Sequence, residues 1–155
     1  MDKLDALNQV ADFHRTFRHP VESTPIIPSP ARCQLRVALL QEELDELKDA
    51  IAKADITEVA DALCDIQYVL AGAVLEFGLG DKFRTLFDEV QRSNMSKACS
   101  TREEAEATAE HYRTQRDTDC FIEQAGDLWL VYRTGDRKTL KSIYYSPANL
   151  RDIIG

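Results

Sequence analysis

The fold is decided by the stretch ITEVADALCDIQYVLAGAVLEF, residues 56–77. Its apolar residues recur around most of the circumference of a helix, which is typical of a helix buried in a bundle or at a subunit interface. Asp61 and Asp65 interrupt this apolar pattern. A carboxylate on such a helix needs a partner, because burial of an unpaired charge is costly. The stretch therefore predicts a central helix with two acidic residues that have a structural or a functional partner.

A second acidic cluster precedes this helix. It is Glu42-Glu43-Leu44-Asp45-Glu46, in a predicted helix from about Pro30 to Lys53 with Ser29 as its N-cap. Glu43 and Glu46 are three positions apart, and so are Glu58 and Asp61 in the following helix. Residues with this spacing lie on the same helix face. The eleven residues between Glu46 and Glu58 predict a tight turn around Lys53 to Asp55.

Two such helices, packed antiparallel, could direct four carboxylates at one point. The four would repel one another strongly unless a cation lay between them. Oxygen ligands without His or Cys suit Mg²⁺ or Mn²⁺, and such metals usually bind phosphates. The two clusters therefore indicate a divalent metal site whose ligands are Glu43, Glu46, Glu58 and Asp61.

Each acidic residue also has a simpler interpretation. Glu43 and Glu46 could belong to a solvated helix face. Glu58 could complete a capping box with Asp55 as the cap. Asp61 and Asp65 could form buried salt bridges, for which the preceding helix offers three donors, Arg32, Arg36 and Lys48.

The rest of the chain predicts a mainly α protein with a small C-terminal β-ribbon and a short terminal helix. We expect a helical domain over residues 1–118 and a β-ribbon with a helix over 119–155, packed on the same domain. Periodicity and capping residues place further helices at about 2–17, 81–94 (capped by Asp81) and 100–115, the last on the surface. Alternating apolar residues and turn signals predict strands at 120–123, 128–132 and 139–143, and a last helix at 146–153.

Composition and charge argue against several classes of function and location. The formal net charge of −8 disfavours non-specific binding to nucleic acid or to an anionic membrane. No apolar run approaches the roughly 20 residues that span a bilayer, and residues 1–5 show no signal peptide. The four cysteines are scattered without a CxxC pair, so we expect reduced structural thiols and a cytoplasmic location. His14, His19 and His111 are isolated, which argues against a di-iron bundle.

The acidic motifs resemble a family signature, EExxE followed by ExxD. This signature belongs to the all-α nucleoside triphosphate pyrophosphohydrolases, which include MazG-like and phosphoribosyl-ATP pyrophosphohydrolase-like proteins. Residues 60–69 resemble the third helix of the latter branch. The segment 92–97, Arg-Ser-Asn-Met-Ser-Lys, resembles its "HRSNMSK" motif with Gln91 in place of the usual histidine, and residues 140–150 resemble its C-terminal tail. The resemblance covers most of the chain.

The resemblance implies a Mg²⁺-dependent enzyme that cleaves a (d)NTP to (d)NMP and pyrophosphate, in housecleaning of the nucleotide pool. It implies Mg²⁺ (or Mn²⁺) held by Glu43, Glu46, Glu58 and Asp61, and phosphate contacts from Asn94 and Lys97. We expect Asp65, Tyr68 and Lys141 to belong to the substrate-binding set as well. Glu42 or Asp65 could position or deprotonate the attacking water, and we favour Glu42 as this catalytic base. It also implies a homodimer or homotetramer, which the apolar helix independently favours.

Several alternatives stay open at this point. Tyr68 could stack on a base or belong to the core. Lys138 and Lys141 could close over a triphosphate or lie on a solvated strand edge. Activity on dUTP or phosphoribosyl-ATP is an alternative, although the C-terminal extension does not fit the compact enzymes of histidine synthesis. A non-catalytic helical oligomer that binds nucleotides or a partner chain is the remaining alternative.

Overall fold

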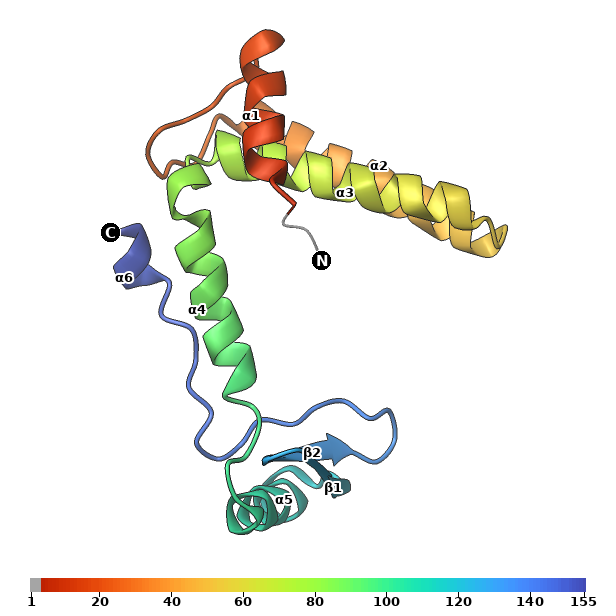
Figure 1. The fold of residues 1–155 in the computed structure, drawn as a ribbon, viewed down its shortest axis with the longest axis vertical. Helices are drawn as coiled ribbons and strands as arrows, with labels where there is room; N and C mark the ends of the chain where they lie inside the picture. Colours follow the sequence, from red (N-terminus) through yellow and green to blue (C-terminus); the bar gives the residue numbers. More distant parts are fainter. Residues whose placement is uncertain (1–3) are drawn as a thin grey trace. The chain divides into compact units, whose positions relative to one another are not determined.

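The computed structural model describes residues 4–155, and its contacts divide the chain into two compact units, Met1–Phe83 and Arg84–Gly155 (Figure 1). Unit 1 contains three helices: α1 (Ala6–Thr16), α2 (Pro30–Ala52) and α3 (Ile56–Glu76). A short 3₁₀ helix, Gly80–Lys82, follows α3. The mainly helical class expected from the sequence is confirmed. No single helix among these residues is long and apolar enough to cross a membrane, although Ile56–Glu76 and Gly80–Met95, a bent pair, together pass that test by length and composition.

An antiparallel hairpin of α2 and α3 forms most of unit 1 (Figure 1). Ser29 caps α2, since its side chain accepts a hydrogen bond from the backbone N–H of Arg32, and Pro30 occupies the first turn. Asp55 caps α3 by accepting from the N–H groups of Thr57 and Glu58. The tight turn expected between the two acidic clusters is present, and it holds them on neighbouring helices.

Both helices of the hairpin end in the same way, with a left-handed residue after the last turn. Ala54 has φ +53° and Gly78 has φ +65°. After α2, the N–H groups of Ala54 and Asp55 donate to the carbonyl oxygens of Ile51 and Ala50. After α3, Gly78 and Leu79 repeat this pattern. These are the two hydrogen bonds of a Schellman motif, which satisfies carbonyl groups that a helix end leaves free.

The core of unit 1 lies where α1 packs on α3. Val10 and Ala11 of α1 are buried there with Ala71 and Leu75 of α3. Beside this cluster His14 is 2% exposed, and its Nδ1 lies 2.8 Å from the carbonyl oxygen of Pro20. Burial is the main reason why the pKa of His14 is lowered. These contacts fix α1 against the end of the hairpin that is remote from Lys53–Asp55.

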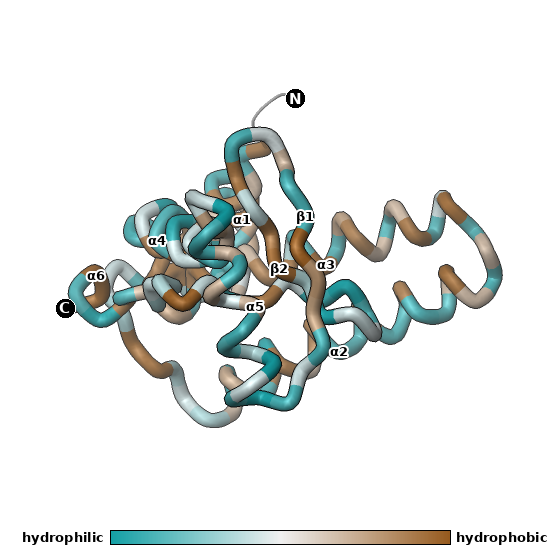
Figure 2. The backbone as a smooth tube through the Cα atoms, turned by 90° about the horizontal axis from the view of Figure 1, so that it is seen from below, coloured by the Kyte–Doolittle hydropathy of each residue, from teal (hydrophilic) through white to brown (hydrophobic). Residues whose placement is uncertain are grey.

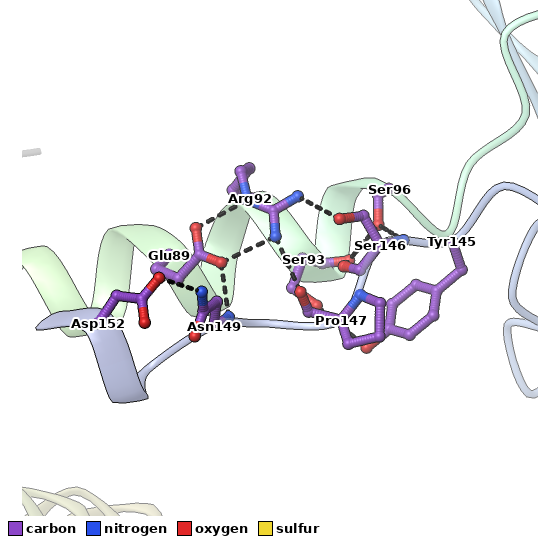
Figure 3. Close-up of polar contacts among 9 residues, drawn as sticks. All are labelled: Glu89, Arg92, Ser93, Ser96, Tyr145, Ser146, Pro147, Asn149 and Asp152. Carbon is purple, nitrogen blue, oxygen red and sulfur yellow. Dashed lines mark hydrogen bonds and ion pairs between the residues drawn. The ribbon is translucent and has the colours of Figure 1, made fainter.

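Helix α4 (Phe83–Met95) lies in unit 2 except for its first residue, and the C-terminal segment runs alongside it (Figure 3). Arg92 donates to the Ser146 hydroxyl and to the carbonyl oxygen of Pro147, each at 3.0 Å. Ser93 and Tyr145 share a hydrogen bond between their hydroxyl groups. Further along, Glu89 accepts from the Asn149 backbone N–H. The segment resembling a family tail is therefore bound along α4 by side chains of the "RSNMSK" region.

The second part of unit 2 is α5 (Arg102–Arg116) packed on an antiparallel pair, β1 (Cys120–Ala125) and β2 (Leu128–Arg133). Thr101 caps α5 by accepting from the Glu104 N–H. Ala105 and Ala109 of α5 are buried with Cys99, Cys120 and Val131, so one face of this polar helix is not on the surface. All four cysteines are free thiols, and burial raises the pKa of Cys99 and Cys120.

Several expected elements are corrected by the structure. Residues 4 and 5 precede α1 rather than belonging to it, and the expected start at Asp2 lies outside the described residues. Asp81 does not cap α4, since it lies within the 3₁₀ helix. The third strand expected at 139–143 is only an isolated bridge between Thr139 and Tyr132, because the chain turns away toward α4. The last helix is Arg151–Ile154 rather than 146–153, because the Ser146 N–H donates to the Ser96 hydroxyl just after α4 and the Asn149 N–H donates to Glu89 of α4.

The division into domains at residue 118 stays a prediction. Within the described residues, α5 packs on β1 and β2, and it belongs to unit 2 together with α4.

Candidate active site

Glu43 is subject to the negative charges of acidic side chains on both helices of the hairpin. The pKa of Glu43 is raised, first by partial loss of solvent and then by negative charges on Asp65, Glu46, Glu42 and Asp61. Two of these neighbours come from α2 and two from α3. Five of the acidic residues named above therefore interact electrostatically, and nearby like charges disfavour the ionised state.

This cluster is not neutralised by basic residues. Arg32 and Arg36, the two arginines considered as partners for Asp61 and Asp65, both bind Glu76 instead. Lys48, the third candidate, pairs with Asp45 at 2.6 Å. None of the five clustered carboxylates has a salt bridge within residues 4–155. The structural salt bridge is therefore excluded as the reason for two aspartates on this helix.

Glu58 lies one turn nearer the interhelix loop than Asp61, about 4.5 Å along the helix axis. It is not among the main acidic neighbours of Glu43. It also does not complete a capping box: the Asp55 N–H, which a capping Glu58 would bind, donates to the Ala50 carbonyl oxygen at 3.1 Å. The capping interpretation of Glu58 is wrong, and its side chain is exposed and available for another role.

The donor chemistry of the cluster fits a hard divalent cation. Carboxylate oxygens are the ligands that Mg²⁺ and Mn²⁺ prefer, and the unneutralised charge of the cluster favours a cation. Among residues 4–155, however, no three His, Cys, Asp or Glu side chains converge closely enough to enclose a metal ion as they stand. The ligand set Glu43, Glu46, Glu58 and Asp61 therefore stays a prediction, as does Mg²⁺ itself.

Tyr68 lies on the same helix as the aspartates, one turn beyond Asp65. Its ring meets that of Phe13 of α1 edge-on at 5.6 Å, and its side chain is 39% exposed. It lines a cavity of about 450 Å³, whose other walls include Leu4, Leu63 and Cys64. Tyr68 is therefore neither a buried core residue nor free of packing, and one face of it borders an apolar cavity within unit 1.

The residues expected to bind phosphate are placed within unit 2. Asn94 and Lys97 are together, since the Lys97 Nζ donates to the Asn94 Oδ1 at 2.8 Å. The Lys141 Nζ lies 4.1 Å from the centre of the Tyr145 ring. The pKa of Tyr145 is lowered, first by its hydrogen bond with Ser93 and then by the charges of Lys141 and Lys97. Both lysines therefore lie near the same phenol oxygen.

A family model described as phosphoribosyl-ATP pyrophosphohydrolase matches residues 10–94, more than half of the chain. The chain belongs to this family. The match contains the whole α2–α3 hairpin and every residue of the acidic cluster. Membership of the phosphoribosyl-ATP pyrophosphohydrolase family indicates a pyrophosphohydrolase, that is, a hydrolase acting on acid anhydrides.

One relative is similar along its whole length. "Uncharacterized protein L479" of Acanthamoeba polyphaga mimivirus is 23% identical over 243 aligned positions, covering 99% of this chain and 97% of that protein. The alignment therefore includes residues 95–155, which lie outside the match to the pyrophosphohydrolase family.

A buried ionic cluster is the feature that the sequence patterns did not reveal. Glu76 is 1% exposed and binds both Arg32 and Arg36, which themselves come from the first two turns of α2. In the sequence, the only indication of this ionic cluster is a glutamate in the last turn of an apolar helix. It could not be interpreted alone, because its partners lie forty or more residues away.

Proposed function

We propose that the protein is a Mg²⁺-dependent nucleoside triphosphate pyrophosphohydrolase that produces a nucleoside monophosphate and pyrophosphate. The observation that carries the proposal is the cluster around Glu43: five carboxylates from two helices, without a basic partner, inside the matched family region. Such a cluster is unfavourable for stability by itself, which is expected where a site is kept for its chemistry.

In this proposal Glu43, Glu46, Glu58 and Asp61 hold the metal. When bound, Mg²⁺ neutralises charge on the phosphate oxygens and lowers the pKa of a coordinated water. Glu42, next to the ligand set in α2, accepts the proton of the attacking water. Attack on the α-phosphorus breaks the bond to the bridging oxygen between the α- and β-phosphates, and pyrophosphate leaves. Tyr68 and the apolar cavity beside it offer a surface for the base.

The raised pKa of Glu43 has a direct consequence for metal binding. A ligand carboxylate must be deprotonated, and Glu43 retains its proton to a higher pH than an ordinary glutamate. As the pH is lowered, metal affinity should therefore begin to fall at a higher pH than it would for a site of ordinary carboxylates.

The function is tested with purified protein and a panel of NTPs and dNTPs, with Mg²⁺ and with EDTA. We expect release of pyrophosphate and monophosphate only with Mg²⁺. Glu46→Gln should lower kcat/KM at least about 100-fold, because a lost ligand removes charge stabilisation worth about 3 kcal/mol or more. The matched control is Asp45→Asn, the neighbouring acid of α2 that is bound to Lys48 and should leave activity unchanged.

Two outcomes would contradict the proposal. Full activity of Glu46→Gln would remove Glu46 from the ligand set. Binding of nucleotide without turnover of any member of the panel would favour the non-catalytic alternative. The panel also decides which base and sugar are preferred, including dUTP, and whether a housecleaning role is tenable.

A further inference from the structure

Unit 2 gathers positive side chains around one cavity. The cavity has a volume of about 480 Å³, and its cationic walls are Lys97, Arg116, Arg133, Lys138 and Lys141. No carboxylate is among its lining residues. Residues 84–155 contain 11 Lys and Arg against 12 Asp and Glu, so unit 2 carries little of the net charge of −8. Within this nearly neutral unit, the cavity collects nearly half of the positive charges.

Most of these cations lack an acidic partner. Of the five, only Arg133 forms a salt bridge within residues 4–155, and its partner is Asp136. Other exposed arginines of unit 2 are paired, Arg84 with Asp88 and Arg102 with Glu106. The side chains of Arg116 and Lys138 have no hydrogen bond or ion pair among the described residues. Unpaired like charges around a cavity repel one another, and an anion in the cavity relieves that repulsion.

The walls of the cavity are held by secondary structure. Arg116 is the last residue of α5 and Arg133 is the last residue of β2. The segment that carries Lys138 and Lys141 is bound to β2, since the N–H of Arg133 donates to the Lys138 carbonyl and that of Leu140 to Val131. The Lys141 N–H donates to the Tyr112 hydroxyl of α5. A cavity with backbone positions fixed in this way loses little conformational freedom when it binds a ligand.

We propose that this cavity binds the phosphate chain of a small phosphorylated molecule, either free pyrophosphate or the chain of a nucleotide, without a metal ion. Arg116 offers a planar fork for phosphate oxygens, and three lysines add point charges, whereas the guanidinium of Arg133 is already bound by Asp136. All five cations lie outside the family match, which ends at residue 94, and Arg116 and Arg133 are not among the phosphate contacts expected from the sequence. Lys97 and Lys141 are also among the residues that the sequence led us to expect at the substrate phosphates, but binding here requires no hydrolysis.

The test is isothermal titration of the full chain in EDTA with pyrophosphate, ATP and AMP. Pyrophosphate and ATP should bind, AMP should bind at least about tenfold more weakly, and added salt should weaken the binding of all three.

Arg116→Gln and Lys138→Gln should each weaken pyrophosphate binding about tenfold, the effect of one charged hydrogen bond. The matched control, Arg84→Gln, removes the same charge from the start of α4 and should change affinity less than twofold. Equal affinity for pyrophosphate and ATP would mean that the cavity recognises the phosphate chain alone. Tighter binding of ATP would mean that it recognises the nucleoside as well.

Other results would overturn the inference. These are no binding of pyrophosphate in EDTA, equal weakening by the Arg84→Gln control, or tighter binding of a short single-stranded oligonucleotide than of ATP. Thermal melting of each variant checks that it is folded, which the exposed positions of Arg116 and Lys138 lead us to expect. This test is independent of the proposed function. The protein could hydrolyse nucleotides with Mg²⁺ and still fail to bind pyrophosphate in EDTA, or it could bind pyrophosphate without hydrolysing any nucleotide.

Discussion

Glu76 is a single side chain on which the end of unit 1 depends. Burial alone would raise its pKa, but hydrogen bonds from Arg36 and Arg32 outweigh that effect and lower it. Two arginines against one glutamate leave excess positive charge, and the Nε of Arg36 is buried without a partner. Breaking a buried ion pair by removing one partner typically costs about 3–5 kcal/mol, because the remaining charge is uncompensated.

We therefore expect Glu76→Gln to lower the free energy of unfolding by about 3 kcal/mol in urea titrations at pH 7. Asp45→Asn, which removes an exposed pair, should change it by less than about 0.5 kcal/mol. A folded-state pKa below the ordinary value of 4.5 contributes stability above that value, and this contribution is lost as the pH falls through the folded pKa. The difference between wild type and Glu76→Gln should thus shrink in strong acid, and a constant difference would contradict this account.

At this scale the sequence was informative where a residue broke a pattern. Asp61 and Asp65 were recognisable because they interrupt an apolar helix, and they do lie near Glu43. The partners of Arg32 and Arg36 were not recognisable, because Asp61, Asp65 and Glu76 all lie on α3 and only the register of the hairpin decides among them. Arg116 and Arg133 gave no local signal at all, since a cavity wall is defined by distant residues.

At the scale of elements, the two ends of the hairpin helices offer a matched comparison. Ala54 and Gly78 occupy equivalent positions with similar positive φ, but only one of them is glycine. A left-handed conformation costs an L-residue about 1–2 kcal/mol, whereas glycine adopts it freely. A Cβ on Gly78 would also lie 1.8 Å from the Thr24 carbonyl oxygen.

Ala54→Gly should therefore stabilise the protein by about 0.5–1 kcal/mol, because relief of strain exceeds the added freedom of the unfolded chain. Gly78→Ala should destabilise it by about 2 kcal/mol or more, since strain and a backbone clash add. Gly126→Ala is the control for φ alone: it has φ +61° but open space around it. Thermal unfolding of the three variants checks this order of stabilities. If Gly126→Ala lowered the stability as much as Gly78→Ala, a steric clash would not explain the effect at Gly78.

The elements were predictable where local signals agreed. Ser29 and Asp55 were each expected to be a cap, and each proved to be one. The end of the chain was not predictable in this way. Ser146-Pro147 reads as a helix start, but the Ser146 N–H donates to the Ser96 hydroxyl of the "RSNMSK" region, and this tertiary bond overrides the local preference.

At the scale of the whole molecule, unit 1 leaves much apolar surface exposed. Figure 2 shows brown segments that recur along both α2 and α3. Val37 is 68% exposed, Ile51 61% and Leu63 52%. Large exposed apolar patches are unusual for a monomer and mark interaction surfaces. The homo-oligomer expected from the apolar helix therefore stays our proposal, with the hairpin as the contact surface.

Light scattering coupled to size-exclusion chromatography should give a mass of at least two chains of 17.6 kDa. Leu63→Glu should shift the protein toward monomer, because a charge at the centre of an apolar contact is left unpaired. Leu128→Glu, at a position of unit 2 that is 37% exposed, is the matched control and should keep the wild-type mass. A wild-type monomer at micromolar concentration would refute the proposal.

One backbone hydrogen bond in unit 2 suggests how a segment of the protein could be exchanged by engineering. The Ser142 N–H donates to the Lys97 carbonyl oxygen at 3.1 Å, so residues 98–141 depart from and return to a single point. A segment with adjacent ends can be exchanged for another with matching ends, provided that the replacement restores the hydrogen bonds that Ser142 and Ile143 make to Glu104 and Thr108 of α5. Residues 98–141, with α5, β1 and β2, are in this sense an exchangeable cassette, and grafting it onto a shorter family member would transfer Arg116, Arg133 and Lys138 as one piece.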